Sequence, residues 1–421
     1  MNTQPNILYI HSHDTGRYIQ PYGHAVPTPA LQRLAEEGVL FRQNFCVTPT
    51  CSPSRAALLT GCYPHENGMT GLAHRGWKLN DYGQHIIHTL RQVGYTSALA
   101  GVQHIATDRA VIGYDHLMKG DDAVAFLENA PRQPFFLDVG FGETHREFPQ
   151  AEDARYCLPP APLPDTPQTR QDMARFKASA RILDEKMGKV FAALERTGLA
   201  QNTLVICTTD HGIAFPRMKC TLYDSGIGTM LILRLPGVFA GGQVVEAMTS
   251  HLDIFPTVCE LAGVAKPAWL RGRSLVKMTG AVHDELFFEI NYHAAYEPVR
   301  AVRTKRWKYI RRFDGRTTAV LANIDDSESK SVWIEHGWPE RAVPQEALYD
   351  LCFDPNEMEN LIADPRRQAV VQDLRDRLRR WMEETRDPLL TGPVPLPAGA
   401  VINDPNDLSP KRNTQSRPTG K

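Results

Sequence analysis

Four short apolar runs, each followed by a polar or glycine-rich loop, constrain the fold of this chain more than any other feature. They are NILYI (6–10), FFLDVGFG (135–142), TLVICTTD (203–210) and MLILRLPG (230–237). Bounded apolar runs of this length are typical of buried strands, and their near-continuous hydrophobicity favours a parallel sheet covered on both faces. The sequence therefore predicts a central, mostly parallel sheet.

Helical patterns alternate with these runs. The segment TPALQRLAEEG offers Thr28 as an N-cap, Pro29 in the first turn and Gly38 as the stop. A longer amphipathic pattern begins at residue 170, and we expect it to end at Gly198. Alternating strands and helices predict a doubly wound α/β domain over residues 1–275.

The pattern changes near residue 280. The segments DELFFEINYH, VRAVRTKRWKYIRRF and EALYDLCFD resemble strands of a smaller, antiparallel sheet, and a helix rich in i,i+4 charge pairs follows over 366–387. We therefore predict a C-terminal subdomain over residues 276–387. The remaining residues, 388–421, are rich in Pro, Asn, Ser and Gly, and we expect an extended or mobile tail there.

Composition argues against several classes of partner. The formal net charge of −1 gives no electrostatic reason to expect nucleic acid or a membrane surface, and no apolar stretch approaches the length of a membrane span. The opening segment MNTQPNILYI has no basic region, so we expect no secretory signal and a cytoplasmic location. The eight scattered cysteines form no CxxC pair, which argues against a disulfide scaffold or a zinc ribbon.

Two of the predicted strands end in an acid–imidazole pair. His13 and Asp14 follow the first run, and Asp210 and His211 follow the third. In open α/β sheets ligands bind beyond the carboxyl ends of the strands, so these side chains could converge on a divalent metal ion. Each pair taken alone could equally well serve only to cap a loop.

Three further residues follow apparent strand ends or lie close after them. His104 and His145 each come directly after an apolar run, and Lys219 lies shortly after the second acid–imidazole pair. Taken singly, each is an ordinary polar residue. Together they indicate a site at one edge of the sheet, in which Lys219 could supply positive charge to an anion.

The segment TPTCSPSRAALLTG (48–61) holds a cysteine at an unusual place. Pro53 is expected early in a helix that continues through the following apolar residues and ends at Gly61. Cys51 then lies at or just before the helix N-terminus, and Arg55 follows about one turn later. A thiolate nucleophile activated by the helix terminus is one interpretation of Cys51.

The stretch CSPSRAALLTG resembles the signature of the sulfatase family, which uses formylglycine and belongs to the alkaline phosphatase superfamily. The similarity extends over nearly the whole chain, through PNILYIHSHDTG, TLVICTTDHG and ALYDLCFDPNEMENLIADP, and its order is similar to the heparan N-sulfatase (sulfamidase) branch. The resemblance implies an α/β fold with a central, mostly parallel sheet flanked by helices and a smaller C-terminal antiparallel subdomain. It also implies hydrolysis of sulfate esters or sulfamates.

The resemblance assigns roles to individual residues. Cys51 would be oxidised to formylglycine, whose hydrate attacks sulfur and ligates a metal together with His13, Asp14, Asp210 and His211. Arg55 would orient this nucleophile. His104 would help to break down the sulfated intermediate, His145 would lie near the leaving group, and Lys219 would contact the sulfate. Together with Cys51, Arg55 and the four metal-binding residues, these three complete the predicted site.

Three departures from the family pattern bear on the metal and the anion. His13 stands where the family has an aspartate, and His211 stands where it has an asparagine. The family ion is calcium, which prefers oxygen ligands, so two imidazoles shift the preference toward manganese, zinc or iron. Val102 replaces the lysine of the family's Lys-x-His motif, which removes a cation expected at the sulfate.

These departures leave a second reaction open. The Asp210-His211 pair also resembles the related phosphodiester and phosphonate monoester hydrolases, which share the fold and the formylglycine. A non-catalytic binder of sulfated ligands is a third interpretation. We expect a small-molecule or saccharide sulfate as substrate, and a formylglycine-generating enzyme as the partner that matures the protein. The loops at 63–77 and 291–297 are expected to form walls of the substrate pocket. The sequence is compatible with a homodimer.

Overall fold

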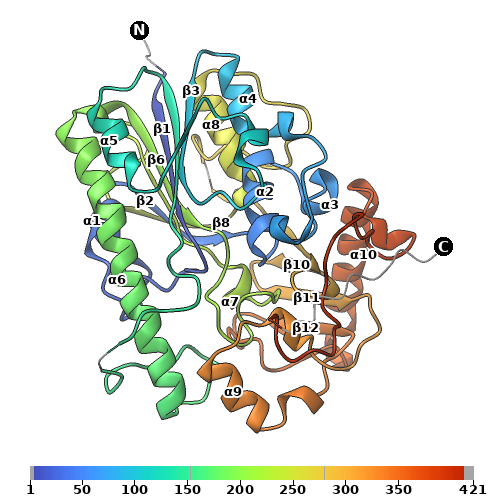
Figure 1. Cartoon of the computed structure of the whole chain (residues 1–421). Helices are drawn as coiled ribbons and strands as arrows, with labels where there is room; N and C mark the ends of the chain where they lie inside the picture. Colours follow the sequence, from blue (N-terminus) through green and yellow to red (C-terminus); the bar gives the residue numbers. More distant parts are fainter. Residues whose placement is uncertain (1–3, 152, 279, 412–421) are drawn as a thin grey trace.

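The computed structural model describes residues 4–151, 153–278 and 280–411, and it has an eight-stranded sheet at its centre (Figure 1). The strand order in this sheet is β4-β3-β5-β1-β6-β7-β2-β8. Its strands are β1 (Asn6–Ser12), β2 (Val39–Phe45), β3 (Thr96–Gly101), β4 (His116–Met118), β5 (Phe135–Gly140), β6 (Thr203–Thr209), β7 (Leu231–Arg234) and β8 (Gln243–Ser250).

The sheet is mostly parallel, as the apolar runs predict. The central strand β1 runs parallel to both neighbours, so that Ile10 pairs with Val139 of β5 and with Cys207 of β6. The run at 230–237 contributes β7, which is antiparallel to both β6 and β2. Its direction could not be predicted, because hydrophobicity along a strand does not depend on which way the strand runs.

Helices cover both faces of this sheet (Figure 1). Ile7 and Tyr9 of β1 pack toward one group of helices, whereas Leu8 and Ile10 pack toward the other, as alternation along a strand requires. The first face is covered by α2 (Cys51–Thr60), α4 (Ile86–Arg91) and α8 (Ile254–Ala262), and the second by α1 (Pro29–Glu37), α5 (Asp122–Glu128) and α6 (Pro167–Arg196).

The helix ends partly follow the predicted signals. Helix α1 begins at Pro29 after Thr28, but the Thr28 hydroxyl accepts the Gln20 N–H and does not cap the helix. The carboxylate of Asp184, in α6, instead accepts the N–H groups of Ala30 and Leu31. The long helix α6 ends at Arg196, two residues before the predicted Gly198.

A second sheet of four antiparallel strands lies beside the first, in the order β12-β11-β10-β9. Its strands are β9 (Glu285–Tyr292), β10 (Tyr296–Thr304), β11 (Trp307–Arg312) and β12 (Glu346–Asp350), and the remaining helices are α3 (Pro64–Asn67), α7 (Asp224–Ile227), α9 (Glu328–Glu335) and α10 (Gln368–Glu384). This confirms the predicted small sheet followed by a helix.

Helix α2 and the small sheet share one hydrophobic cluster. Ala57 of α2 and the nearby Tyr63 pack with Tyr309 of β11, Leu348 of β12 and Trp381 of α10. The domain boundaries at residues 275 and 387 therefore stay a prediction, since the core is continuous across the first of them.

The tail beyond α10 is anchored to the rest of the protein. It begins with a single 3₁₀ turn, Pro388–Leu390, and its side chains Val394 and Asn403 are buried. Residues 412–421 of the predicted tail, and 1–3 of the predicted N-terminal domain, lie outside the described residues. Within the described part of the chain, no helix combines the length and apolarity that a membrane crossing needs.

Candidate active site

Helix α2 begins at Cys51, as the sequence predicts. Thr50 precedes it in an extended conformation, and Gly61 ends the helix with a left-handed φ of 70°. A Cβ at Gly61 would lie 2.3 Å from a methyl group of Leu270, so both conformation and space require glycine there. The side chain of Cys51 is buried, although it sits at the helix terminus.

The ends of β1 and β6 bring the two acid–imidazole pairs together. These strands are adjacent and parallel, and Ser12 pairs with Thr209, so both pairs leave the sheet at the same edge. The main-chain N–H of Asp14 donates to Oδ1 of Asp210 at 2.8 Å. Asp14 itself has a φ of 54°, which turns the chain sharply after the strand.

All five residues predicted to hold a metal form one buried cluster. One potential ligand atom from each lies within 4.8 Å of those of the others, and the members are His13, Asp14, Cys51, Asp210 and His211. Two imidazole nitrogens, two carboxylates and one sulfur are a donor set that binds divalent transition metals. The residues present therefore fit a divalent metal ion.

Distances within the cluster show that its members face one another. Nε2 of His211 lies 3.3 Å from Sγ of Cys51 and 3.3 Å from Oδ1 of Asp14. Nδ1 of His13 lies 2.7 Å from Oδ1 of Asp14 and 3.2 Å from Oδ2 of Asp210. Burial lowers the pKa of His13 to about 4, so its imidazole is neutral near neutral pH and can act as a ligand.

Two buried cations neutralise the carboxylates. Arg55 donates from Nη2 to Oδ2 of Asp210 at 2.9 Å and to the carbonyl of Ser12 at 2.8 Å. Nζ of Lys219 lies 2.7 Å from Oδ2 of Asp14 and 2.8 Å from Oδ2 of Asp325. Sequence reasoning missed Asp325, because it lies in a loop more than a hundred residues beyond Lys219.

These contacts decide the charge of the cluster. Burial by itself would raise the pKa of Asp14, but Lys219 and the nearby imidazoles hold it well below its ordinary value. Burial would likewise raise the pKa of Asp210, but the nearby charges, chiefly that of Arg55, lower it below its ordinary value. Burial would lower the pKa of Lys219, yet Asp14 and Asp325 raise it. Both carboxylates are therefore ionised and both cations are charged at neutral pH.

A row of histidines leads from the cluster to the surface. Nδ1 of His104 lies 3.4 Å from Nε2 of His13, and Nε2 of His104 lies 3.2 Å from Nδ1 of His74. Burial, followed by the charge of His13, lowers the pKa of His104 to about 2. The ring of His145 lies 4.6 Å from that of His13, edge to face. The structure thus places both predicted catalytic histidines beside the cluster.

The two loops predicted to wall the substrate pocket also reach this region. His74, in the loop at 63–77, stacks on His104 with ring centroids 5.4 Å apart. His293, in the loop at 291–297, is buried, and its Nδ1 has no hydrogen-bond partner among the described residues. Burial and the nearby charge of Lys219 lower the pKa of His293 to about 3.

The environment of Cys51 disfavours a thiolate. Burial raises the pKa of its thiol well above the ordinary value, and the carboxylates of Asp14 and Asp210 add to this effect against the opposing charge of Lys219. The unmodified side chain is therefore a neutral thiol, which is a weak nucleophile. This argues against the interpretation of Cys51 as an activated thiolate.

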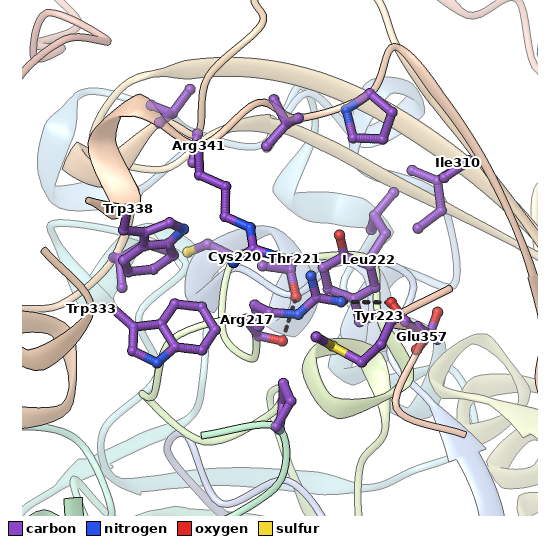
Figure 2. A pocket seen from close by; sticks show the side chains of 18 of the residues that line it. Arg217, Cys220, Thr221, Leu222, Tyr223, Ile310, Trp333, Trp338, Arg341 and Glu357 are labelled. Carbon is purple, nitrogen blue, oxygen red and sulfur yellow. Dashed lines mark hydrogen bonds between the residues drawn. The ribbon is translucent and has the colours of Figure 1, made fainter. Parts of the chain in front are cut away.

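A separate cavity of about 640 Å³ lies against one face of the small sheet. Figure 2 shows Trp333 and Trp338 on one side of it and Arg217 on another, where Arg217 donates to the main-chain carbonyl of Glu357 at 2.7 Å. Within the described part of the chain, none of the predicted metal-binding or catalytic residues lines this cavity, although Glu297, at the end of the loop at 291–297, does. Cavity size alone therefore does not locate the cluster around Cys51.

Comparison with known proteins agrees with this geometry. The family model described as sulfatase matches residues 5–121 and 120–264, which is more than half of the chain. The chain belongs to the sulfatase family. A second family model, described as N-sulphoglucosamine sulphohydrolase, C-terminal, matches residues 211–337 of this sulfatase-family chain. The resemblance seen in the sequence is confirmed, and the chain is a hydrolase of the sulfatase type.

Individual relatives cover nearly all of the chain. Human N-sulphoglucosamine sulphohydrolase is 28% identical and covers 92% of this chain and 92% of its own length. An ulvan-active sulfatase of Formosa agariphila is 27% identical, covering 95% of this chain and 77% of its own. A solved phosphonate monoester hydrolase from Silicibacter pomeroyi shares the fold, with a TM-score of 0.68, 21% identity, and coverage of 92% and 97% respectively.

Proposed function

We propose that this chain is a metal-dependent hydrolase of sulfate esters or sulfamates, with Cys51 as the precursor of a formylglycine nucleophile. The observation that carries the proposal is the position of Cys51, at the first residue of α2 and 3.3 Å from Nε2 of His211 within the buried cluster. The match to the N-sulphoglucosamine sulphohydrolase C-terminal model and the human relative favour a sulfated amino sugar as substrate.

The cluster is suited to hold one divalent ion. His13, Asp14, Asp210 and His211, with the modified residue 51, are the side chains that would bind it. An ion bound there supplies Lewis acidity, which withdraws charge from the sulfuryl oxygens and lowers the pKa of the nucleophile. The two imidazoles favour manganese, zinc or iron over calcium, because calcium prefers a shell of oxygen ligands.

Residue 51 is the first residue of α2, so its side chain would contact the bound sulfate group at the N-terminus of this helix. Hydrated formylglycine would supply one hydroxyl that attacks sulfur as the bond from sulfur to the leaving group breaks. Deprotonation of its second hydroxyl would then expel sulfate by C–O cleavage and restore the aldehyde. Arg55 is fixed by Asp210 and the carbonyl of Ser12, so it orients residue 51 from one turn along the helix. Unpaired N–H groups in the first turn of α2 favour negative charge there. A formylglycine-generating enzyme is the partner that this maturation needs.

Two histidines are placed to move protons. His104 lies beside the cluster, with Nδ1 3.4 Å from Nε2 of His13, and we propose that it accepts a proton from the hydroxyl of the sulfated residue 51. His145 is only partly buried and its ring lies 4.6 Å from that of His13, and we propose that it donates a proton to the leaving oxygen or nitrogen. General acid–base help of this kind contributes about 10²–10⁴-fold.

A phosphodiester or phosphonate monoester hydrolase is the second candidate. One observation favours it, the pairing of Asp210 with His211; in addition, the apolar Val102 stands where the family has a lysine. The fold shared with the phosphonate monoester hydrolase is compatible with this reaction. Sulfate monoesters and phosphodiesters carry the same single negative charge, so the loss of one cation does not by itself separate them.

A direct comparison of substrates tests the proposal. The chain is produced together with a formylglycine-generating enzyme and assayed with N-sulfoglucosamine, an aryl sulfate and an aryl phosphodiester. We expect kcat/KM to be higher for the sulfamate or sulfate ester than for the phosphodiester, and activity to be lost in Cys51→Ala. A higher kcat/KM for the phosphodiester would overturn the assignment in favour of the second candidate.

A further inference from the structure

The cavity against the small sheet has the properties of a site for a small organic molecule. Its volume is about 640 Å³, and sites for such molecules measure about 300–1,000 Å³ and are lined mainly by apolar side chains. Much of its wall is apolar here as well, with Ile290 of β9, Val299 of β10 and Ile310 of β11 among the lining residues. Size and lining together therefore suit an apolar ligand.

Aromatic rings form a further part of the wall. Trp333 of α9 and the nearby Trp338 lie edge to face, with ring centroids 4.8 Å apart (Figure 2). Tyr223 and Tyr349 form a second edge-to-face pair, with centroids 5.9 Å apart. These rings offer large apolar surfaces, so a ligand that packs against them needs an apolar body.

Two carboxylates also line the cavity, and each already has a cationic partner. Oε1 of Glu297 accepts a hydrogen bond from Nη1 of Arg312 at 2.9 Å. Oε1 of Glu357 lies 2.9 Å from Nζ of Lys308, and both of these side chains are buried. Their negative charges are therefore balanced within the protein, and they give a cationic ligand little reason to bind.

Two arginines that line the cavity have no such partner. Arg217 is half-buried, donates to the main-chain carbonyl of Glu357 at 2.7 Å and lies 4.0 Å from the ring centroid of Tyr223. Arg341 is exposed, and Figure 2 shows its side chain and that of Arg217 extending into the cavity. In the part of the chain that the structure describes, neither guanidinium forms an ion pair with a carboxylate. Two unpaired guanidinium groups favour an anion, because they donate charge-assisted hydrogen bonds to its oxygens.

The main chain at Arg217 is held in an unfavourable conformation. Its φ is 62°, in the left-handed region that residues with a Cβ rarely adopt. The hydroxyls of Thr221 and Ser225 donate to its carbonyl at 3.1 and 2.8 Å, which stabilises this conformation. Arg217 is therefore positioned before a ligand arrives, and prior ordering lowers the entropy that binding costs.

The wall segment at 217–223 connects the cavity with the reaction centre. It carries Lys219, and the N–H of Cys220 donates to the carbonyl of Pro49 at 2.9 Å, two residues before Cys51. Cys220 lines the cavity, whereas Lys219 and Cys51 do not. A ligand in the cavity therefore contacts the segment that carries Lys219 without contacting the metal cluster.

We propose that this cavity is a second binding site, separate from the reaction centre, for an amphiphilic anion. Such a ligand has an apolar body and one anionic head group, either a carboxylate or a sulfur oxyanion. The body packs against the tryptophans and the small sheet, and the head group accepts hydrogen bonds from Arg217 and Arg341. Binding there does not depend on the hydrolase reaction proposed above.

Isothermal titration calorimetry with three probes of one chain length tests this site. The probes are octanoate, octane-1-sulfonate and octylammonium, none of which carries a sulfate ester. We expect one anion per chain, and binding of octylammonium that is weaker by about tenfold or more, because it cannot accept hydrogen bonds from arginine. The two anions distinguish a carboxylate from a sulfur oxyanion as the preferred head group. Failure of both anions to bind, or equal affinity for the cation, would overturn the proposal.

Two variants change the charge and the space of the cavity separately. Arg341→Gln removes one cation at an exposed position, and the Kd of the bound anion should rise about tenfold. Ala319→Trp places a large side chain where a small one lines the cavity, and binding should be lost. Arg379→Gln is the matched control, because that side chain is 75% exposed on α10, and its Kd should stay unchanged.

Thermal unfolding of each variant checks that it is folded. If Ala319→Trp does not fold, Arg341→Gln still decides the role of the charge. An unchanged Kd in Arg341→Gln would overturn the assignment of the head group to this arginine. Unchanged binding in a folded Ala319→Trp would show that the anion binds elsewhere.

Tryptophan fluorescence locates the bound anion independently. A bromine atom quenches a tryptophan that it contacts, so 8-bromooctanoate should quench part of the emission of the six tryptophans of the wild type. The double variant Trp333→Phe and Trp338→Phe should lose this quenching. Trp269→Phe should keep it, because Trp269 is 37% exposed and does not line the cavity. Equal quenching in the double variant and the wild type would overturn the proposal.

Discussion

Nζ of Lys219 lies 2.7 Å from Oδ2 of Asp14, so the cation proposed to contact the sulfate is ion-paired to a residue of the predicted metal cluster. Asp325 holds the same ammonium from the other side at 2.8 Å. Lys219 therefore cannot swing freely toward a substrate. Its charge acts from a fixed position, which links binding of the anion to the electrostatics of the cluster.

Replacing Lys219 tests this fixed position. Lys219→Met removes the charge and should lower kcat/KM for the sulfated substrate by about 10²–10³-fold, the usual cost of a preorganised charge. Asp325→Asn keeps the lysine but loosens its position, so a smaller loss is expected. Lys277→Ala is the control, because that side chain is 86% exposed. Steady-state kinetics of the three variants give the result, and a loss below twofold in Lys219→Met would contradict the assigned role.

The modification of Cys51 can be detected chemically. When the chain is produced together with a formylglycine-generating enzyme, an aldehyde-specific aminooxy probe should label the unfolded protein at residue 51. Unfolding is needed because the side chain of Cys51 is only 2% exposed. Cys62→Ala, at another buried cysteine, should keep the label, and Cys51→Ala should lose it. Peptide mass spectrometry locates the label, and an unlabelled wild type would remove the basis of the proposed chemistry.

The metal preference depends on His13. After removal of bound metal and exposure to equal amounts of manganese, zinc and calcium, the wild-type protein should retain a transition metal, whereas His13→Asp should shift toward calcium. Elemental analysis of the dialysed proteins measures this without any assay of activity. His116→Asp, at an exposed position on β4, is the control. Calcium in the wild-type protein would show that the imidazoles do not set the preference.

A buried pair outside the site predicts how stability depends on pH. Nδ1 of His65 lies 3.0 Å from Oε2 of Glu289, and both side chains are buried. Burial lowers the pKa of His65, but Glu289 outweighs this and raises it above its ordinary value. Burial opposes ionisation of Glu289 as well, yet His65 and Arg300 lower its pKa to about 2.

The two shifts have opposite pH dependence. The contribution of His65 is fully present below its unfolded pKa of about 6.5 and is lost as the pH rises through the folded value. The contribution of Glu289 is present above its unfolded pKa of about 4.3 and is lost as the pH falls toward 2. His65→Gln should therefore lower the free energy of unfolding most near pH 5.5, by about 3 kcal/mol, and clearly less at pH 9.

Thermal unfolding at the two pH values checks this prediction. The difference in melting temperature between wild type and His65→Gln should shrink as the pH rises. His116→Gln, at an exposed histidine, should leave the melting temperature nearly unchanged at both values. A difference for His65→Gln that grows with pH would show that the imidazole is not stabilised in its charged form.

Much of the fold follows from local pattern, and the exceptions have physical reasons. The strands β1, β5 and β6 are buried throughout, so their apolar runs are nearly unbroken. Strand β8 was not predicted, because its first half is exposed and carries polar residues. Strand β4 has only three residues, too few to show a period.

In the candidate site, too, some residues follow from local sequence pattern and others depend on the tertiary fold. The helix start at Cys51 and the strand ends after β1 and β6 are local features, so the five clustered residues could be predicted. Asp325 lies in the loop before α9 and meets Lys219 only through the tertiary fold, so no local pattern encodes that approach. The tail was expected to be extended or mobile from its composition, but its anchors at Arg75 and Ala294 depend on the packing of distant loops.

The hydrophobic cluster between α2 and the small sheet has a consequence for the time course of synthesis. Ala57 of α2 packs with Tyr309, Leu348 and Trp381, which leave the ribosome roughly 250–320 residues later. At about 5–20 residues per second, α2 waits about 12–65 s before its packing partners exist. In the complete fold the side chain of Cys51 is only 2% exposed. The proposed oxidation of residue 51 would therefore have to occur before the C-terminal half packs against α2.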